Sequence, residues 1–244
     1  MVDLPPQKSH RAIGRAAGLN PDVRFDRFHV EAVDDGWEHE EELPVLRTEV
    51  TDEVARSVIS RNSSPDLSFD RSINPYRGCE HGCIYCYARP SHAFLGMSPG
   101  LDFETKLIAK PNAAAQLEKE LSNRRYVPKI IAIGTNTDAN QPIEKKREIM
   151  RDVLKVLSAF NHPVGIVTKG TLIARDIDIL APMAEKGLVR VGISITTLDP
   201  KIVAVNGAAR TCACRTIAHH AAAYRRWYSG AGDGVACRAR ADGS

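Results

Sequence analysis

Apolar runs and amphipathic stretches alternate through the middle of the chain. Four short apolar runs have the length of buried strands, and the stretches between them repeat apolar side chains at helical spacing. The predicted strands are residues 72–76, 129–133, 164–168 and 188–195. The predicted helices are residues 113–121, 143–160 and 175–185, and Gly187 is expected to end the last of them.

Each predicted helix has one apolar face that we expect to cover a sheet. The expected inward side chains are Ala114, Leu117 and Leu121 in the first helix, Ile149, Val153, Val156 and Phe160 in the second, and Ile177, Leu180 and Ala184 in the third. Strands that alternate with helices imply a parallel sheet in an α/β fold. In such sheets ligands bind at the carboxyl ends of the strands.

The two flanks differ from this α/β pattern. Residues 1–60 are predicted to form a partly disordered arm, with an acidic run at residues 34–42 and an edge strand or short helix within residues 45–59. The core is predicted to span residues 61–205. Residues 206–244 are predicted to be a tail that is non-native or disordered.

Composition and charge add only broad limits. A chain of 244 residues can bury a sizeable core as a single α/β barrel. The net charge of +3 is too weak to indicate nucleic-acid binding. No apolar run has the length of a membrane span, and residues 1–11 lack the apolar region of a signal peptide. We therefore expect a cytoplasmic protein without a membrane partner.

Three cysteines supply the clearest chemistry in the chain. Cys79, Cys83 and Cys86 have a C-x3-C-x2-C spacing, and Gly78 and Gly82 allow the chain to wrap closely around a bound group. A [4Fe–4S] cluster normally takes four cysteines, so three would leave one iron open to a small molecule. An open iron that transfers an electron is the starting requirement of radical chemistry with S-adenosylmethionine (SAM).

Zinc and disulfide roles are the alternatives for these cysteines. Zinc sites usually combine two cysteine or histidine pairs, and no second pair lies at zinc-finger distance here. The nearby histidines are His81 and His92. A disulfide is disfavoured because nothing in the sequence indicates secretion. The spacing favours the cluster.

The cysteine motif resembles that of the radical SAM enzymes. The wider string from Asp70 to Arg89, with Tyr85 and Tyr87 beside the last two cysteines, is similar to the branch related to spore photoproduct lyase, and within it to an actinobacterial-type group. The resemblance covers residues 61–205 and includes three later strand-end motifs in the same order. It implies a partial TIM-like (β/α) barrel with about four of the family's six strand–helix units.

The resemblance also implies which side chains contact SAM or the cluster. The implied residues are Tyr85 and Tyr87 beside the cysteines, Thr135, Asn136 and Asp138 after the second strand, Lys169 after the third strand, and Ser194 near the end of the fourth. Simpler interpretations stay open for several of them. Asp138 or Asn140 can cap a helix, Lys169 can be a solvated loop lysine, and the tyrosines can belong to the core.

The implied reaction begins at the open iron. The amino and carboxylate groups of SAM would bind that iron, and reduction by a donor such as flavodoxin or ferredoxin would release a 5′-deoxyadenosyl radical that acts on an unknown substrate. The alternatives are a non-catalytic metal-binding remnant and a DNA photoproduct lyase-like repair enzyme. Residues 129–138 contain no cysteine, and spore photoproduct lyases return a hydrogen through a cysteine in that region. DNA is therefore possible as a partner but unsupported.

The composition changes abruptly after residue 205. Residues 206–244 contain eleven alanines and six arginines but no leucine, lysine or glutamate. Such a composition is typical of GC-rich DNA read in a wrong frame. Codons for residues 206–210, read one base later, can encode Met-Glu-Pro-Arg-Ala, a string that the resembled family carries after its fourth strand. We therefore hypothesise a frameshift near codon 206, which would leave a poorly stable chain and can abolish its activity.

Two other interpretations of the tail stay open. It can be an ordinary disordered segment. It can also hold a second metal, because Cys212, Cys214, His219 and His220 lie close together in the sequence.

Overall fold

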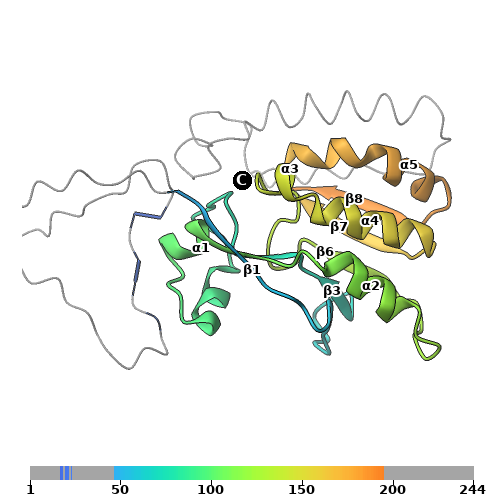
Figure 1. The fold of residues 1–244 in the computed structure, drawn as a ribbon, viewed down its shortest axis with the longest axis horizontal. Helices are drawn as coiled ribbons and strands as arrows, with labels where there is room; N and C mark the ends of the chain where they lie inside the picture. Colours follow the sequence, from blue (N-terminus) through green and yellow to red (C-terminus); the bar gives the residue numbers. More distant parts are fainter. Residues whose placement is uncertain (1–16, 19, 22, 24–46, 195–244) are drawn as a thin grey trace, which may run out of the picture.

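The computed structural model describes residues 17, 18, 20, 21, 23 and 47–194 of the chain. Within these residues the protein is a mixed α/β structure with two sheets (Figure 1). The larger sheet carries the parallel strands that the alternating pattern predicts. The smaller sheet positions the cysteine loop.

The five-stranded sheet has the order β2-β3-β6-β7-β8. Its strands are β2 (Ile59–Arg61), β3 (Arg71–Ile73), β6 (Ile131–Ile133), β7 (Val164–Thr168) and β8 (Val189–Ile193). β3, β6, β7 and β8 are parallel, and β2 pairs antiparallel with β3. The four parallel strands form part of a (β/α) barrel, and the described residues close no barrel.

The three-stranded sheet has the order β1-β5-β4. It consists of β1 (Glu49–Asp52), β4 (Tyr76–Arg77) and β5 (Lys106–Ala109). The 3-10 helix η1 (Arg89–Leu95) and the helix α1 (Leu101–Thr105) precede β5. Sequence analysis did not predict β5, and it gave residues 45–59 an edge strand or a short helix. β1 and β2 show that these residues and the two that follow supply strands to both sheets.

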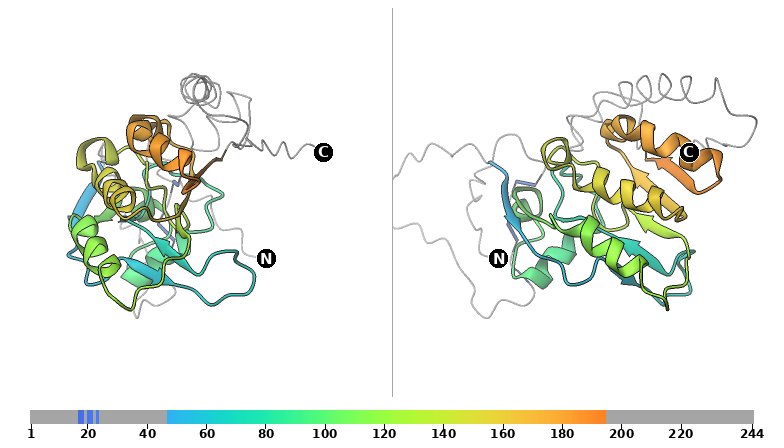
Figure 2. Two further views of the ribbon diagram at one scale, coloured as in Figure 1. Left: turned by 90° about the vertical axis from the view of Figure 1, so that its right-hand side faces the viewer. Right: turned by 45° about the vertical axis from the view of Figure 1, so that its right-hand side comes forward.

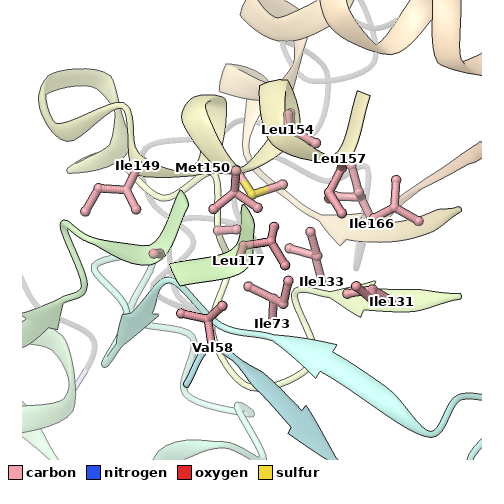
Figure 3. Packing of buried hydrophobic residues seen from close by; sticks show 14 of the residues in the cluster. Val58, Ile73, Leu117, Ile131, Ile133, Ile149, Met150, Leu154, Leu157 and Ile166 are labelled. Atoms are coloured by element: carbon pink, nitrogen blue, oxygen red, sulfur yellow. The ribbon is translucent and has the colours of Figure 1, made fainter. Parts of the chain in front are cut away.

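Three helices cover one face of the five-stranded sheet (Figure 2). They are α2 (Ala113–Leu121), α4 (Ile149–Ala159) and α5 (Ile177–Glu185), and they pack side by side in that order. The core lies between these helices and the strands. Figure 3 shows Leu117 of α2 and Met150 of α4 above Ile73 and Ile133 of the sheet, and all four side chains are fully buried.

The first predicted strand, residues 72–76, is divided between the two sheets. β3 ends at Ile73 and β4 begins at Tyr76, so the chain changes sheet at Asn74 and Pro75. A proline has no N–H to donate to a ladder, which makes position 75 a natural place for the change. The Pro75 carbonyl accepts a hydrogen bond from Lys110 N at 3.0 Å, immediately after β5.

The predicted helix 143–160 is two helices. α3 (Glu144–Arg147) ends at Glu148, which has a left-handed φ of 53°, and α4 begins directly after it. The cause is the buried carboxylate of Glu144, which accepts hydrogen bonds from Met150 N at 3.0 Å and Arg151 N at 3.3 Å. These are N–H groups that the first turn of a helix cannot pair by itself. The side chain of Glu144 therefore begins a new helix.

The predicted helix 175–185 is also divided, into the 3-10 helix η2 (Thr171–Asp176) and α5. Gly187 ends α5 as expected, with a φ of 70°. Its N–H and that of Leu188 bind the carbonyls of Ala184 and Met183, which is a usual helix termination. Pro182 lies inside α5 and exposes its side chain.

The buried faces of the helices are rotated slightly from the predicted ones. In α4 the buried set is Ile149, Met150, Val153, Leu154 and Leu157, whereas Val156 is half-buried and Phe160 is 39% exposed. In α2 and α5 the buried residues are Ala113, Leu117, Leu121, Leu180 and Met183. The prediction for α4 assumed one continuous helix from residue 143. α4 ends at Ala159, so Phe160 lies beyond the helix, and its buried face includes Met150, Leu154 and Leu157, which the prediction left out.

Several sequence predictions lie outside the described residues. These are the acidic run at residues 34–42, the histidine and cysteine group of the tail, and the whole of residues 206–244. Within residues 47–194 and the few described residues before them, no helix is long and apolar enough to cross a membrane.

Candidate functional site

The cysteine loop turns through two glycines with positive φ. Gly78 has a φ of 76° and Gly82 a φ of 61°, both in the region that side chains rarely adopt. A Cβ on Gly78 would lie 2.9 Å from Phe103 O, and one on Gly82 would lie 2.7 Å from the carboxylate of Glu104. The loop is therefore pressed against α1. The Cys79 N–H donates to Phe103 O at 2.9 Å at the same contact.

All three cysteines of the motif are free thiols on this loop. Cys79 and Cys83 are buried, and Cys86 is half-buried. Burial, together with the negative charge of Asp138, raises the pKa of the Cys79 thiol well above its usual range. A bound metal would replace that proton, since metals bind the thiolate.

The end of β7 brings Lys169 to the cysteine loop. Its Nζ donates to Cys83 Sγ at 2.8 Å and lies 3.5 Å from the Tyr85 hydroxyl, over the tyrosine ring. Burial alone would lower the pKa of Lys169, but the contacts with Cys83 and Tyr85 outweigh it and raise the pKa. This contact could not be predicted from the sequence, because Lys169 and Cys83 are 86 positions apart in the chain.

Asp138 connects the end of β6 with the end of β7. Its carboxylate accepts from the Thr168 hydroxyl at 2.6 Å and from Lys169 N at 2.8 Å, and His81 Nε2 lies 3.4 Å away. Burial would raise the pKa of Asp138, but His81 and the donors from Thr168 and Lys169 hold it at about 2. Its Oδ1 also accepts from Asn140 N at 2.9 Å, so Asp138 orders a turn and is not a helix cap.

The other predicted residues after β6 lie beside the aromatic side of the cysteine loop. The Tyr87 hydroxyl donates to Thr135 O, and the Thr135 hydroxyl accepts from Asn74 Nδ2 at 3.4 Å. Asn136 N donates to Asn74 Oδ1 at 3.2 Å. The tyrosines are not core residues, because Tyr85 is 46% and Tyr87 77% exposed.

Ser194 lies just after β8 and does not contact the cysteines in the described residues. Its N–H donates to Thr168 O at 2.8 Å, and its side chain is exposed. Lys169, Asp138 and Ser194 are therefore carried by the carboxyl ends of three neighbouring parallel strands, where the sheet rule predicts a binding site.

Sequence analysis missed four residues that surround the cysteine loop. Arg89 Nε donates to Cys83 O at 2.9 Å, and its guanidinium pairs with the buried carboxylate of Glu104. Gln141 contacts the backbone on both sides of Cys79, and His81 faces Asp138. No spacing rule marks these side chains as partners of the loop. The one available signal was that His81 and Arg89 lie within the string from Asp70 to Arg89 that resembles the family.

The thiols can bind a cluster without meeting at one point. Among the described residues, no three cysteine, histidine or acidic side chains lie close enough to hold a single metal ion. In an iron–sulfur cluster each thiolate binds a different iron, so the three ligands need only surround the cluster. Three free thiols on a loop shaped by two positive-φ glycines fit that requirement.

The comparisons with known proteins agree with the cysteine motif. The model of the radical SAM superfamily matches residues 73–223. An uncharacterized protein of Mycobacterium tuberculosis is 40% identical over 136 residues, which cover 56% of this chain and 40% of that protein. An uncharacterized protein of Methanocaldococcus jannaschii is 27% identical over 127 residues, which cover 52% of this chain and 44% of that protein.

A solved structure is also similar to the chain. It is a spore photoproduct lyase complexed with a dinucleoside spore photoproduct, with 21% sequence identity and a TM-score of 0.41. The similarity covers 60% of this chain and 39% of that structure. The chain thus spans well under half the length of the proteins and the structure that it matches.

The family match rests on more than the cysteines. It begins at Ile73, the last residue of β3, and continues through every later strand and helix that the structure describes. Members of this family use an iron–sulfur cluster together with SAM. The family model matches more than half of the residues of this chain, so the chain belongs to the radical SAM superfamily.

Proposed function

We propose that this protein binds a [4Fe–4S] cluster through Cys79, Cys83 and Cys86 and cleaves SAM reductively. The observation that carries this proposal is the position of the three free thiols, on one loop at the carboxyl ends of parallel strands. When bound, the cluster would supply the electron that releases a 5′-deoxyadenosyl radical from SAM. The substrate of that radical is unknown.

The side chains at the strand ends are proposed to orient SAM. Lys169 offers a flexible ammonium group for the SAM carboxylate. Thr135, Asn136 and Asp138 offer oxygen atoms for the SAM amino group, and Ser194 offers a hydroxyl. Tyr85 and Tyr87 offer exposed rings that can pack on the cluster or on adenine.

Anaerobic reconstitution with iron and sulfide tests the proposal directly. The wild-type chain should gain absorbance near 400 nm and form 5′-deoxyadenosine from SAM in the presence of a strong reductant. Cys83→Ala should lose both signals, because a cluster with two protein ligands is not retained. Cys237→Ala, a cysteine outside the motif, is the matched control and should keep both.

The same experiment separates the alternatives. A chain that holds the cluster but forms no 5′-deoxyadenosine would be a non-catalytic metal-binding protein. A chain that holds zinc, or no inorganic sulfide, would refute the proposal. A lyase acting on DNA photoproducts would need activity on ultraviolet-damaged DNA, and no residue contact described above favours that substrate.

The proposed chemistry requires a reductant and protection from oxygen. Radical SAM enzymes need an electron donor and a substrate, and we propose flavodoxin or ferredoxin as the donor. A reducing compartment such as the cytoplasm would suit the cluster. No feature of the described residues identifies the electron donor or the substrate.

We also propose that residues 206–244 are translated from a shifted reading frame. The support is their excess of alanine and arginine and the family-like string that a shift of one base allows. The family match continues to residue 223 and so overlaps the beginning of this segment. Sequencing the gene tests this frameshift. A continuous codon pattern that matches relatives past codon 206 would refute it.

A further inference from the structure

Gln141 is a fully buried side chain that contacts the cysteine loop on both sides of Cys79. Its Oε1 accepts a hydrogen bond from Glu80 N at 2.8 Å, and its Nε2 donates to Gly78 O at 3.2 Å. One planar amide therefore pairs the carbonyl before Cys79 and the N–H after it. This is the pairing that a neighbouring strand would otherwise provide.

The remaining backbone groups of Cys79 are also paired. Its N–H donates to Phe103 O at 2.9 Å, and its carbonyl accepts from Gly82 N at 3.3 Å. The peptide groups on both sides of Cys79 are thus fixed. A side chain leaves the backbone in a direction that these groups determine, so the position of the Cys79 sulfur follows from the same hydrogen bonds.

Gln141 is itself held by the ends of β6 and β7. Its N–H contacts the Asp138 carbonyl at 3.4 Å, and its carbonyl accepts from Glu144 N at 2.9 Å. The neighbouring Asn140 packs closely on the turn after β7, where a Cβ on Gly170 would lie 2.5 Å from the Asn140 carbonyl oxygen. The amide of Gln141 therefore transmits the position of the strand ends to the cysteine loop.

A buried glutamine is not needed to fill this space. An apolar side chain of similar length would occupy it without the cost of desolvating an amide. The amide is favourable here because both of its ends are paired with backbone groups of the loop, and the bond to Gly78 O is buried. The chemistry of position 141 therefore serves the loop and not only the packing of the core.

We propose that Gln141 is a positioning residue for the cluster ligand Cys79. The proposal rests on the proposed function and adds to it a residue that acts through the backbone of the cysteine loop. Removal of the amide should free the Gly78 and Glu80 peptide groups and loosen Cys79 on its iron. Residues that orient metal ligands typically contribute about 10- to 100-fold in metal affinity.

The test uses the full chain with its cluster reconstituted anaerobically. Gln141→Met keeps the length of the side chain and removes both hydrogen bonds. We expect it to release iron to a chelator about 10-fold faster than wild type, with altered g values in the electron paramagnetic resonance spectrum of the reduced cluster. A loss of global stability alone would not change those g values.

Gln116→Met is the matched control. Gln116 also donates its amide to a backbone carbonyl, that of Arg56 at 2.7 Å, but it lies on α2 away from the cysteine loop. It should release iron at the wild-type rate and keep the wild-type spectrum. Gln141→Glu keeps the acceptor for Glu80 N–H but sets a carboxylate oxygen against Gly78 O, so iron release at least as fast as that of Gln141→Met is expected. If Gln141→Met does not fold, the iron-release rate and the spectrum of Gln141→Glu test the proposal in its place.

The outcomes are distinct from those that test the proposed function. If wild type holds the cluster and Gln141→Met matches it in both iron release and spectrum, the positioning role is refuted and the proposed function stands. If wild type assembles no iron–sulfur cluster, the proposed function fails first and this inference fails with it.

Discussion

Two ionisable side chains at the strand ends keep their charges although they lie at a partly buried site. Burial by itself would neutralise both Asp138 and Lys169. His81 and the Thr168 and Lys169 donors hold the pKa of Asp138 at about 2, and Cys83 and Tyr85 raise the pKa of Lys169. At neutral pH the site therefore presents one carboxylate and one ammonium group. These are the charges that would complement the amino and carboxylate groups of an amino acid such as SAM.

A third ionisable side chain is buried in its neutral form. His92 is fully buried, donates Nε2–H to Lys106 O at 2.9 Å, and packs its ring against Phe103. Among the described residues, its Nδ1 has no hydrogen-bond partner. Burial lowers the pKa of His92 from its usual value of 6.5, and the Lys106 carbonyl and Asp102 offset this effect only in part.

His92 predicts a pH dependence of stability. The unfolded state takes up a proton near pH 6.5 and the folded state only at lower pH, so the stability contribution is complete above pH 6.5. It should decline below that pH by at most about 1.4 kcal/mol per pH unit. Urea unfolding of the metal-free chain at several pH values measures it. His92→Gln should flatten the profile, and an unchanged slope would contradict the assignment.

Among the secondary-structure elements, the junction of α3 and α4 depends on one buried carboxylate. Glu144 is fully buried, begins α4 through Met150 N, and pairs with Arg175 of η2 at 2.8 Å. Arg175 also pairs with Asp176 at 2.8 Å. The carboxylate thus joins two neighbouring strand–helix units.

Glu144→Gln should destabilise the fold strongly. It removes the charge of the fully buried partner of an ion pair, and breaking a buried pair typically costs on the order of 3 kcal/mol. Chemical denaturation of the metal-free chain measures the loss. Glu148→Gln is the control in the same segment, because Glu148 has 55% of its side chain exposed and lies 3.7 Å from Arg175. That exposed pair should contribute less than about 1 kcal/mol, and equal losses in both variants would contradict the role given to Glu144.

On the scale of the whole molecule, the cysteine loop connects the two sheets. It follows β4 of the smaller sheet, contacts Phe103 beside β5, and is paired by Gln141 and Lys169 from the ends of β6 and β7. A bound cluster would add three further bonds, one to each cysteine of the loop. Binding would therefore stabilise the arrangement of both sheets and not just the loop.

Reconstitution should accordingly raise the melting temperature. A ligand that binds only the folded state at about 100 times its Kd adds about 2.7 kcal/mol. For a chain of this size the shift is on the order of 5–10 °C. Anaerobic calorimetry of the loaded and metal-free chains measures it. Cys83→Ala treated in the same way should show no shift, and a shift of similar size in that variant would mean that the metal binds elsewhere.

The sequence was most informative where a short pattern is sufficient. Helix α2 and strand β7 have the predicted bounds, Gly187 ends α5, and the cysteine spacing led to the family. It was less informative where a distant partner decides. Pro75 marks a break within residues 72–76, but nothing local shows that β4 joins a second sheet, that Glu144 starts a new helix, or that residues 106–109 form a strand between β1 and β4.

The order of apolar and polar residues thus determined the fold class, and the spacing of three cysteines determined the chemistry to look for. Local periodicity and ligand spacing are properties of neighbouring residues, so they can be read without coordinates. Only the tertiary structure decided which side chains surround the cysteines. Lys169, Gln141 and Glu104 reach the loop from separate elements, and which of them pair follows from how those elements pack against one another.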